Sequence, residues 1–171
     1  MSYVLENSIY SVDKEERKIF ASFFSNVFND NDIRRMNDLL LIMTLVTTME
    51  IGYFNRRIEV DNFLDKYNES YNNAEKIKNS LLQIVNFIRE LNLEDKSYWF
   101  NKTNIFSLIV ELSRFNLENI NKSILMDNLM EVEGKYKSYR AKITDDIDSE
   151  SISYFILAKE AVNDKKSRIQ R

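Results

Sequence analysis

Residues 72–92 read NNAEKIKNSLLQIVNFIRELN, and apolar side chains recur in this stretch every three or four positions. This spacing matches the turn of an α-helix and places the apolar side chains on one face. The positions concerned are Ala74, Ile77, Leu81, Ile84, Val85, Ile88 and Leu91. We therefore predict a helix that lies against a protein core and keeps its opposite face in solvent.

The N-terminal part of the chain carries the same helical pattern. Residues 13–28 place a stripe of apolar side chains behind Asp13, which opens a capping box. The Asn-Asp-Asn-Asp run at 29–32 predicts the end of this helix and the cap of a second one, because short polar side chains bond exposed backbone groups. The second helix is expected to run to about Met49 and to be central, since its middle, 39–46, is apolar nearly all round.

Further helices are predicted on both sides of residues 72–92. Gly52 is the expected stop of the second helix, and a shorter helix should follow around 60–67. Thr103 is the expected N-cap of an apolar helix at 105–115. A longer helical stretch is predicted over 117–143, where Gly134 lowers helix propensity by about 1 kcal/mol relative to alanine and favours a kink.

The fold class follows from this succession of helical segments. Strand-like alternation, hairpin dipeptides and internal repeats are absent from the sequence. We predict an all-α fold, a single compact multi-helix bundle of about six to eight helices. Residues 1–12 form an N-terminal extension in this scheme, 13–163 the helical bundle domain, and 164–171 a basic C-terminal tail.

The composition excludes several kinds of catalytic site. The 171 residues include no histidine, no cysteine and no proline, and the two glycines are Gly52 and Gly134. A Ser-His-Asp or Cys-His nucleophile, a thiolate zinc site and a Glu-x-x-His di-iron site therefore cannot be built from this chain. A glycine-rich phosphate loop is also missing. We assign no catalytic, cofactor-binding or metal-binding residue and expect no cofactor.

The net charge and the hydropathy of the chain limit which partners it can bind and whether it can span a membrane. A formal net charge of −3 disfavours binding of nucleic acid or an anionic membrane by the whole surface, although a local basic patch is compatible with it. The most apolar run, 39–46, is much shorter than the roughly 20 residues that span a bilayer. The N-terminus lacks the pattern of a secretion signal. We expect a cytoplasmic protein without a membrane partner.

Basic residues gather at three places along the chain. Two arginine pairs and a C-terminal segment are candidate contacts to phosphate groups or to a partner. The residues are Arg34, Arg35, Arg56, Arg57, Lys165, Lys166, Arg168 and Arg171. The alternative is that they are solvated helix ends, paired with nearby acidic side chains.

Two other clusters have a functional and a structural interpretation. The acidic residues at 145–150 and the run at 29–32 could bind a metal ion, but they lack the loop glycine and downstream glutamate of an EF-hand, so we favour helix capping. Tyr98, Trp99 and Phe100 could stack on nucleic-acid bases beside Lys102. We favour packing at one end of the bundle, which is typical of consecutive large aromatic residues before a helix cap.

Several short motifs, taken in order, resemble a known family. They are RRMND at 34–38, IEVDNFLDKY at 58–67, WFNKTNIFSLIV at 99–110 and KKSRIQR at 165–171. The order and spacing resemble the helical C-terminal region of GmrSD-type restriction proteins, from about Asp13 to the end of the chain. That family also contains a ParB-like catalytic domain, and this chain has neither its Gly-x-Gln-Arg-like segment nor the histidine-based nuclease domain of some members.

The resemblance implies a non-catalytic part of a bacterial, DNA-directed phage-defence protein. Such a module would act as a scaffold that positions DNA or a nuclease domain, either covalently attached or as a separate protein partner. DNA would be contacted through the basic helix ends. The alternative is a small acidic helical protein, encoded by a phage or its host, that regulates or inhibits a partner protein.

Overall fold

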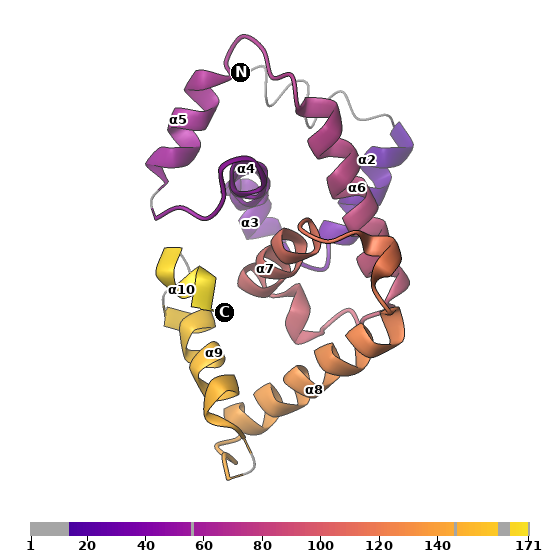
Figure 1. The fold of residues 1–171 in the computed structure, drawn as a ribbon, viewed down its shortest axis with the longest axis vertical. Coiled ribbons are helices and arrows are strands. Elements are labelled where there is room, and N and C mark those ends of the chain that lie inside the picture. The colour runs from indigo at the N-terminus through magenta and orange to yellow at the C-terminus, as the bar shows by residue number, and fades with distance from the viewer. Residues whose placement is uncertain (1–13, 56, 146, 161–164, 171) are drawn as a thin grey trace.

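The computed structural model describes residues 14–55, 57–145, 147–160 and 165–170. Every regular element in these ranges is a helix (Figure 1). The α-helices are α2 (Lys14–Phe24), α3 (Asp30–Arg34), α4 (Asn37–Ile51), α5 (Ile58–Lys66), α6 (Ala74–Glu90), α7 (Lys102–Leu112), α8 (Lys122–Arg140), α9 (Ser149–Glu160) and α10 (Lys165–Gln170). Two 3₁₀ turns, η1 (Tyr98–Phe100) and η2 (Leu117–Asn119), lie between them. The all-α prediction is confirmed, and seven of the α-helices described have nine or more residues.

The core lies among α4, α6 and α7. Both α4 and α6 pack on α7, and α2 packs on α6 (Figure 1). The side chains with no exposed surface include Leu45 on α4, Val85 and Ile88 on α6, and Ile105 and Ile109 on α7. The helix predicted over 72–92 is confirmed as α6, with one buried and one exposed face. Burial within α4 is strongest in its second half, because residues 37–42 are only half-buried.

The C-terminal part of the chain forms an arm that returns to the centre. α8 runs away from α7, α9 packs on α8 and turns back, and α10 follows α9 (Figure 1). Phe155 anchors α9, since it is 2% exposed and its ring lies 5.4 Å from the rings of Tyr136 and Tyr139 on α8. Residues 165–170, expected as part of a basic tail, form a helix. The expected N-terminal extension, 1–12, and the capping residue Asp13 lie outside the described residues.

The cap predicted at 29–32 is confirmed, but the helix before it, predicted over 13–28, already ends at Phe24. The Asn29 side chain accepts a hydrogen bond from the Asp32 backbone N–H at 3.1 Å, and the Asp32 carboxylate accepts one from the Asn29 backbone N–H at 3.2 Å. These two bonds form a reciprocal capping box at the start of α3. Asp32 also pairs with Lys102 on α7 and accepts a hydrogen bond from Asn37 at 3.0 Å. One carboxylate therefore holds α3, the start of α4 and α7 together.

The helix that follows this cap is interrupted, which the apolar pattern does not predict. Met36 adopts a left-handed backbone conformation with φ of 55°, and this residue separates α3 from α4. The side chain of Asn37 reaches back to Asp32 across the turn, which stabilises the break. The prediction of one helix to about Met49 is therefore wrong at its start. Its end agrees, because Gly52, with φ of 79°, follows the last residue of α4.

Two helix starts in the C-terminal half also differ from expectation. The N-cap of α7 is Asn101, whose side chain accepts a hydrogen bond from the Thr103 N–H at 3.2 Å, so the prediction for Thr103 is wrong. The reason is the preceding η1 turn, which leaves Asn101 with the extended backbone that an N-cap needs. The stretch 117–143 is divided by Asn121, the N-cap of α8. α8 then runs through Gly134 as one uninterrupted helix.

The pairing of Asp32 predicts how stability changes with pH. The contact with Lys102, then the hydrogen bonds from Asn37 and Asn29, lower the pKa of Asp32 to about 2, although burial opposes this. The unfolded-state pKa is about 3.9, so the ionised carboxylate stabilises the fold above about pH 4, and this contribution is lost as the pH falls toward 2. We expect Asp32→Asn to be less stable than the wild type at pH 6, with a difference that shrinks on acidification. Urea unfolding at a series of pH values measures this, and a difference that stays constant from pH 6 to pH 3 would contradict it.

Candidate functional sites

The fold brings two of the predicted basic segments together. The backbone N–H of Lys165, at the start of α10, donates a hydrogen bond to the side-chain oxygen of Asn55 at 2.9 Å. Asn55 lies in the turn between α4 and α5, next to the second arginine pair. The two segments are 110 positions apart in sequence. The segments that carry Arg57, Lys165 and Lys166 therefore lie close together, and we call these three residues the basic surface.

The other predicted contact residues lie elsewhere or are not described. Arg34 and Arg35 are exposed at the end of α3, and no contact joins them to the basic surface among the residues that the structure describes. Arg56 and Arg171 lie outside the described residues. Arg168 belongs to α10, but its side chain is not among those described.

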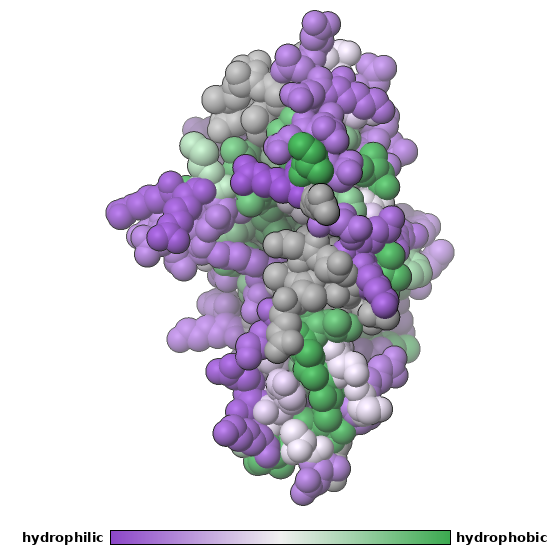
Figure 2. All heavy atoms as spheres, turned by 90° about the vertical axis from the view of Figure 1, so that its left-hand side faces the viewer, coloured by the Kyte–Doolittle hydropathy of each residue, from purple (hydrophilic) through white to green (hydrophobic). Residues whose placement is uncertain are grey.

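The side chains of the basic surface are available to a ligand. Arg57, Lys165 and Lys166 are exposed, and none of them forms an ion pair within the described ranges. Pairing with acidic residues, one part of the alternative interpretation, is not seen for these three side chains, whereas their exposure fits its other part, solvated helix ends. Figure 2 views this side of the molecule and shows mostly hydrophilic side chains around the level of α10, with an apolar strip over α9 below it. On α9, Ile156 has 40% of its surface exposed.

One further cation lies close to this surface. Arg114, just after α7, stacks on the ring of Tyr53 with its guanidinium carbon 5.0 Å from the ring centroid. Tyr53 precedes Asn55 by two residues, and its hydroxyl donates a hydrogen bond to Glu111 at 2.8 Å. Glu111 is also 3.5 Å from the guanidinium of Arg114. The charge of Arg114 is thus partly balanced by Glu111, unlike that of the three residues of the basic surface.

The acidic segments act as helix caps. Asp148 accepts hydrogen bonds from the backbone N–H of Ser151 at 2.7 Å and from its hydroxyl at 2.8 Å, and it pairs with Lys135 at 2.9 Å. The Ser151 bonds and the Lys135 ammonium hold the pKa of Asp148 well below its usual range. The capping interpretation is confirmed for Asp32 and Asp148. Across the described part of the chain, no three acidic side chains gather in an arrangement that could hold a metal ion.

The aromatic residues at 98–100 pack inside the protein. Trp99 is 8% exposed, and its ring N–H donates a hydrogen bond to the Leu129 carbonyl of α8 at 2.9 Å. Tyr98 stacks on Tyr136 with ring centroids 4.0 Å apart. The packing interpretation is therefore confirmed over base stacking for these two residues. Phe100 is half-buried and packs edge-on against Phe23 of α2.

A small pocket lies beside this aromatic cluster. Its lining combines the rings of Tyr136, Tyr139 and Phe155 with the cationic side chains of Arg140 and Lys159. The volume is about 100 Å³. Sites for small organic ligands usually have volumes of about 300–1,000 Å³, so this pocket is too small for a nucleotide.

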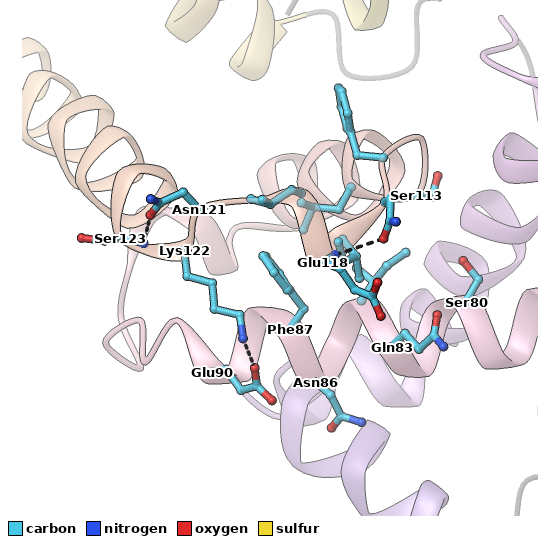
Figure 3. Close-up of a pocket in the computed structure, with 16 residues that line it drawn as sticks. Ser80, Gln83, Asn86, Phe87, Glu90, Ser113, Glu118, Asn121, Lys122 and Ser123 are labelled. Carbon is cyan, nitrogen blue, oxygen red and sulfur yellow. Dashed lines mark hydrogen bonds and ion pairs between the residues drawn. The ribbon is translucent and has the colours of Figure 1, made fainter.

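A larger groove runs between α6 and the connection from α7 to α8 (Figure 3). Its volume is about 880 Å³. Apolar side chains such as Phe87, Leu117 and Ile120 line it together with amide, hydroxyl and carboxylate groups. Figure 3 shows Glu118 and Lys122 extending from the connection toward α6, where Lys122 pairs with Glu90. We call this site the α6 groove.

The apolar pattern of the sequence does not predict the α6 groove. It predicts one helical stretch over 117–143, whereas η2 and the cap at Asn121 turn the chain away from α6 and open the groove. The available signal was the spacing of Asn116 and Asn121, because two asparagines that flank a short segment are typical of successive helix caps.

The comparisons with known proteins identify no relative of this chain. No protein-family model matches the sequence. No curated protein and no solved structure shows significant similarity to it. Of the helices in the described ranges, none is long and apolar enough to cross a membrane.

Proposed function

We propose that this chain is a non-catalytic helical interaction module that contacts DNA through its basic surface. The observation that carries the proposal is the hydrogen bond between Lys165 and Asn55, which joins two distant basic segments on one face. Exposed lysine and arginine side chains without acidic partners suit phosphate groups, because binding releases the counterions that surround DNA. With a net charge of −3 for the whole chain, DNA contact would be confined to this face.

The proposal includes a companion nuclease. The ordered motifs that resemble GmrSD-type restriction proteins support this part, together with a sequence that has no histidine or cysteine. In this proposal the chain holds DNA or a nuclease domain in position in the bacterial cytoplasm, and the partner supplies the catalytic groups. A nuclease domain encoded in the same or the neighbouring reading frame, and co-purification of that domain with this chain, would support it. If neither is found, the restriction part of the proposal fails.

A second candidate function is binding and regulation of a partner protein. The α6 groove favours it, because an open site with an apolar floor and a polar rim is typical of protein recognition. This function does not require the basic surface, so the two candidates can be tested separately.

DNA binding is tested by charge reversal. We expect labelled double-stranded DNA to bind the wild type at about 50 mM salt and to bind much more weakly at about 200 mM. The triple variant Arg57→Glu, Lys165→Glu and Lys166→Glu should bind at least about tenfold more weakly and should reduce the slope of log affinity against log salt by about three. Fluorescence anisotropy measures both quantities, and circular dichroism verifies that the variant is folded.

The matched control carries the same change in charge away from the basic surface. Lys14, Lys76 and Lys96 are exposed on α2, on α6 and in the loop after α6, respectively. Replacing all three with glutamate should weaken DNA binding less than the first triple variant does. An equal loss in both variants would mean that only net charge matters, and absence of DNA binding by the wild type at low salt would remove the proposal.

A further inference from the structure

We propose that the α6 groove binds an extended polypeptide segment in which an apolar residue is flanked by lysine or arginine. The occupant follows from three features of the groove, which are its unused hydrogen-bonding groups, its apolar floor and its charge. The segment would belong to the partner protein of the second candidate function, on which this proposal rests, and its binding is independent of DNA contact because the groove and the basic surface use different elements.

Six residues of α6 line the groove; two of them are Ile84 and Asn86, and the other four form one stripe. Ser80, Gln83, Phe87 and Glu90 are spaced by three and four residues, so they project from the same side of the helix. Ser80 is half-buried and Gln83 and Glu90 are exposed, so this side of the helix presents polar groups to the open groove. The side chain of Gln83 forms no hydrogen bond with any other described residue. Its amide can therefore donate to and accept from a ligand backbone.

The opposite wall presents amide groups that are already oriented. The oxygen of Asn116 accepts a hydrogen bond from the backbone N–H of Glu118 at 3.1 Å, and the oxygen of Asn121 accepts bonds from Ser123 at 3.0 Å and Ile124 at 3.2 Å. Each asparagine is thus fixed by its oxygen, and its NH₂ group has no partner within the ranges described. Fixed NH₂ donors suit the carbonyl groups of an extended peptide, because little side-chain entropy is lost on binding.

The floor can bury an apolar side chain. Phe87 is 6% exposed, whereas Phe115 at the edge of the groove is 64% exposed. Leu117 and Ile120 are half-buried between them in the lining. An exposed aromatic ring beside a partly covered apolar floor is typical of a site that receives an anchoring side chain from a partner.

The charge of the groove selects a basic residue on the ligand. The lining contains two carboxylates, Glu90 and Glu118, and one ammonium group, that of Lys122. Lys122 pairs with Glu90 and lies over the Phe87 ring, 5.2 Å from its centroid. Glu118 has no ion-pair partner among the described side chains, so the lining carries one uncompensated negative charge. A lysine or arginine of the ligand would compensate it.

An extended segment fits these features better than a helix does. A helix bound in a groove presents a continuous apolar stripe, and it satisfies its backbone groups internally. Such a ligand would leave the oriented amides of Gln83, Asn116 and Asn121 without partners and partly desolvated, at a cost in free energy. An extended peptide offers its own N–H and C=O groups to those amides.

The experiment selects ligands for the full chain from random peptides displayed on phage. We expect enriched sequences to share an apolar residue near a lysine or arginine. A synthetic peptide of the consensus should bind the wild type in fluorescence anisotropy, and Phe115→Ala or Glu118→Lys should weaken it by about tenfold each. A peptide whose basic residue is replaced with glutamate should bind Glu118→Lys more tightly than it binds the wild type. This reversal is not expected if Glu118 only supports the fold.

Controls separate this inference from its competitors. Ile58 is 51% exposed and Glu59 is exposed, both on α5 and away from the groove, so Ile58→Ala and Glu59→Lys should bind the peptide as the wild type does. The charge-reversed variant of the basic surface should also bind the peptide normally, and Glu118→Lys should still bind DNA. Lack of enrichment, an acidic consensus, or equal weakening by the α5 variants would overturn the inference. A wild-type dimer that dissociates on Phe115→Ala would assign the groove to a second copy of the chain and would likewise overturn it.

Discussion

Trp99→Ala is expected to lower the free energy of unfolding by about 3–5 kcal/mol, which is the usual cost of removing a buried large aromatic side chain. Trp99 is 8% exposed, and it joins the η1 turn to α8 through the hydrogen bond to the Leu129 carbonyl. Its backbone N–H is also bonded to the hydroxyl of Ser97, at 3.3 Å, which fixes the turn. Alanine would leave a cavity between α7 and α8 and would remove the ring hydrogen bond.

The measurement is urea unfolding followed by far-ultraviolet circular dichroism, because this substitution removes the only tryptophan. Trp99→Phe is the matched control, since it keeps a ring in the site and loses the N–H donor. We expect it to cost about 1–2 kcal/mol. If Trp99 instead stacked on nucleic-acid bases at the surface, Trp99→Ala would change the free energy of unfolding by less than about 0.5 kcal/mol and would weaken binding of single-stranded DNA.

The helical fold was predictable because local chemistry determines most of it. The apolar spacing in 72–92 corresponds directly to α6, and the short polar side chains at 29–32 form the predicted cap. Gly52 ends α4 with a positive φ that other residues rarely adopt. In each case the deciding interactions lie within a few residues of one another.

The wrong helix boundaries have two causes, one a contact between distant residues and the other an adjacent turn. α3 and α4 are separate because Asp32 binds both Asn37 and Lys102, and Lys102 is 70 positions away. Apolar periodicity contains no information on such a contact. Asn101 caps α7 in place of Thr103 because the η1 turn sets its backbone, and both residue types are good caps. A choice between two good capping residues two positions apart therefore could not be made from the sequence.

The candidate sites also combine features that the sequence predicts with features that depend on tertiary contacts. The sequence predicts which residues are basic, but the meeting of Asn55, two residues before Arg57, with α10 depends on the return of α8 and α9 to the centre of the bundle. That return depends in turn on Phe155, whose burial against α8 is a tertiary contact. The α6 groove could not be predicted either, because it forms only where η2 turns the chain between two helices.

Ile109→Ala is the second substitution with a large expected effect. Ile109 lies in the middle of α7, the helix on which both α4 and α6 pack, and it has no exposed surface. Truncation of a fully buried isoleucine to alanine costs about 2–5 kcal/mol, because packing is lost and the surrounding side chains collapse only partly into the cavity. Urea unfolding followed by both Trp99 fluorescence and circular dichroism measures this, and coincidence of the two curves supports two-state behaviour.

Two control substitutions test whether the expected loss of stability comes from the buried position of Ile109. Ile109→Val removes one methylene group and should cost about 0.5–1.5 kcal/mol. Phe115→Ala removes a larger side chain just after the same helix, but Phe115 is 64% exposed, so its cost should stay within about 0.5 kcal/mol. If the Phe115 substitution destabilised the protein as much as the Ile109 substitution, α7 would not be the centre of the core. A stable Phe115→Ala variant would also mean that any loss of peptide binding in it reflects the α6 groove itself and not a weakened fold.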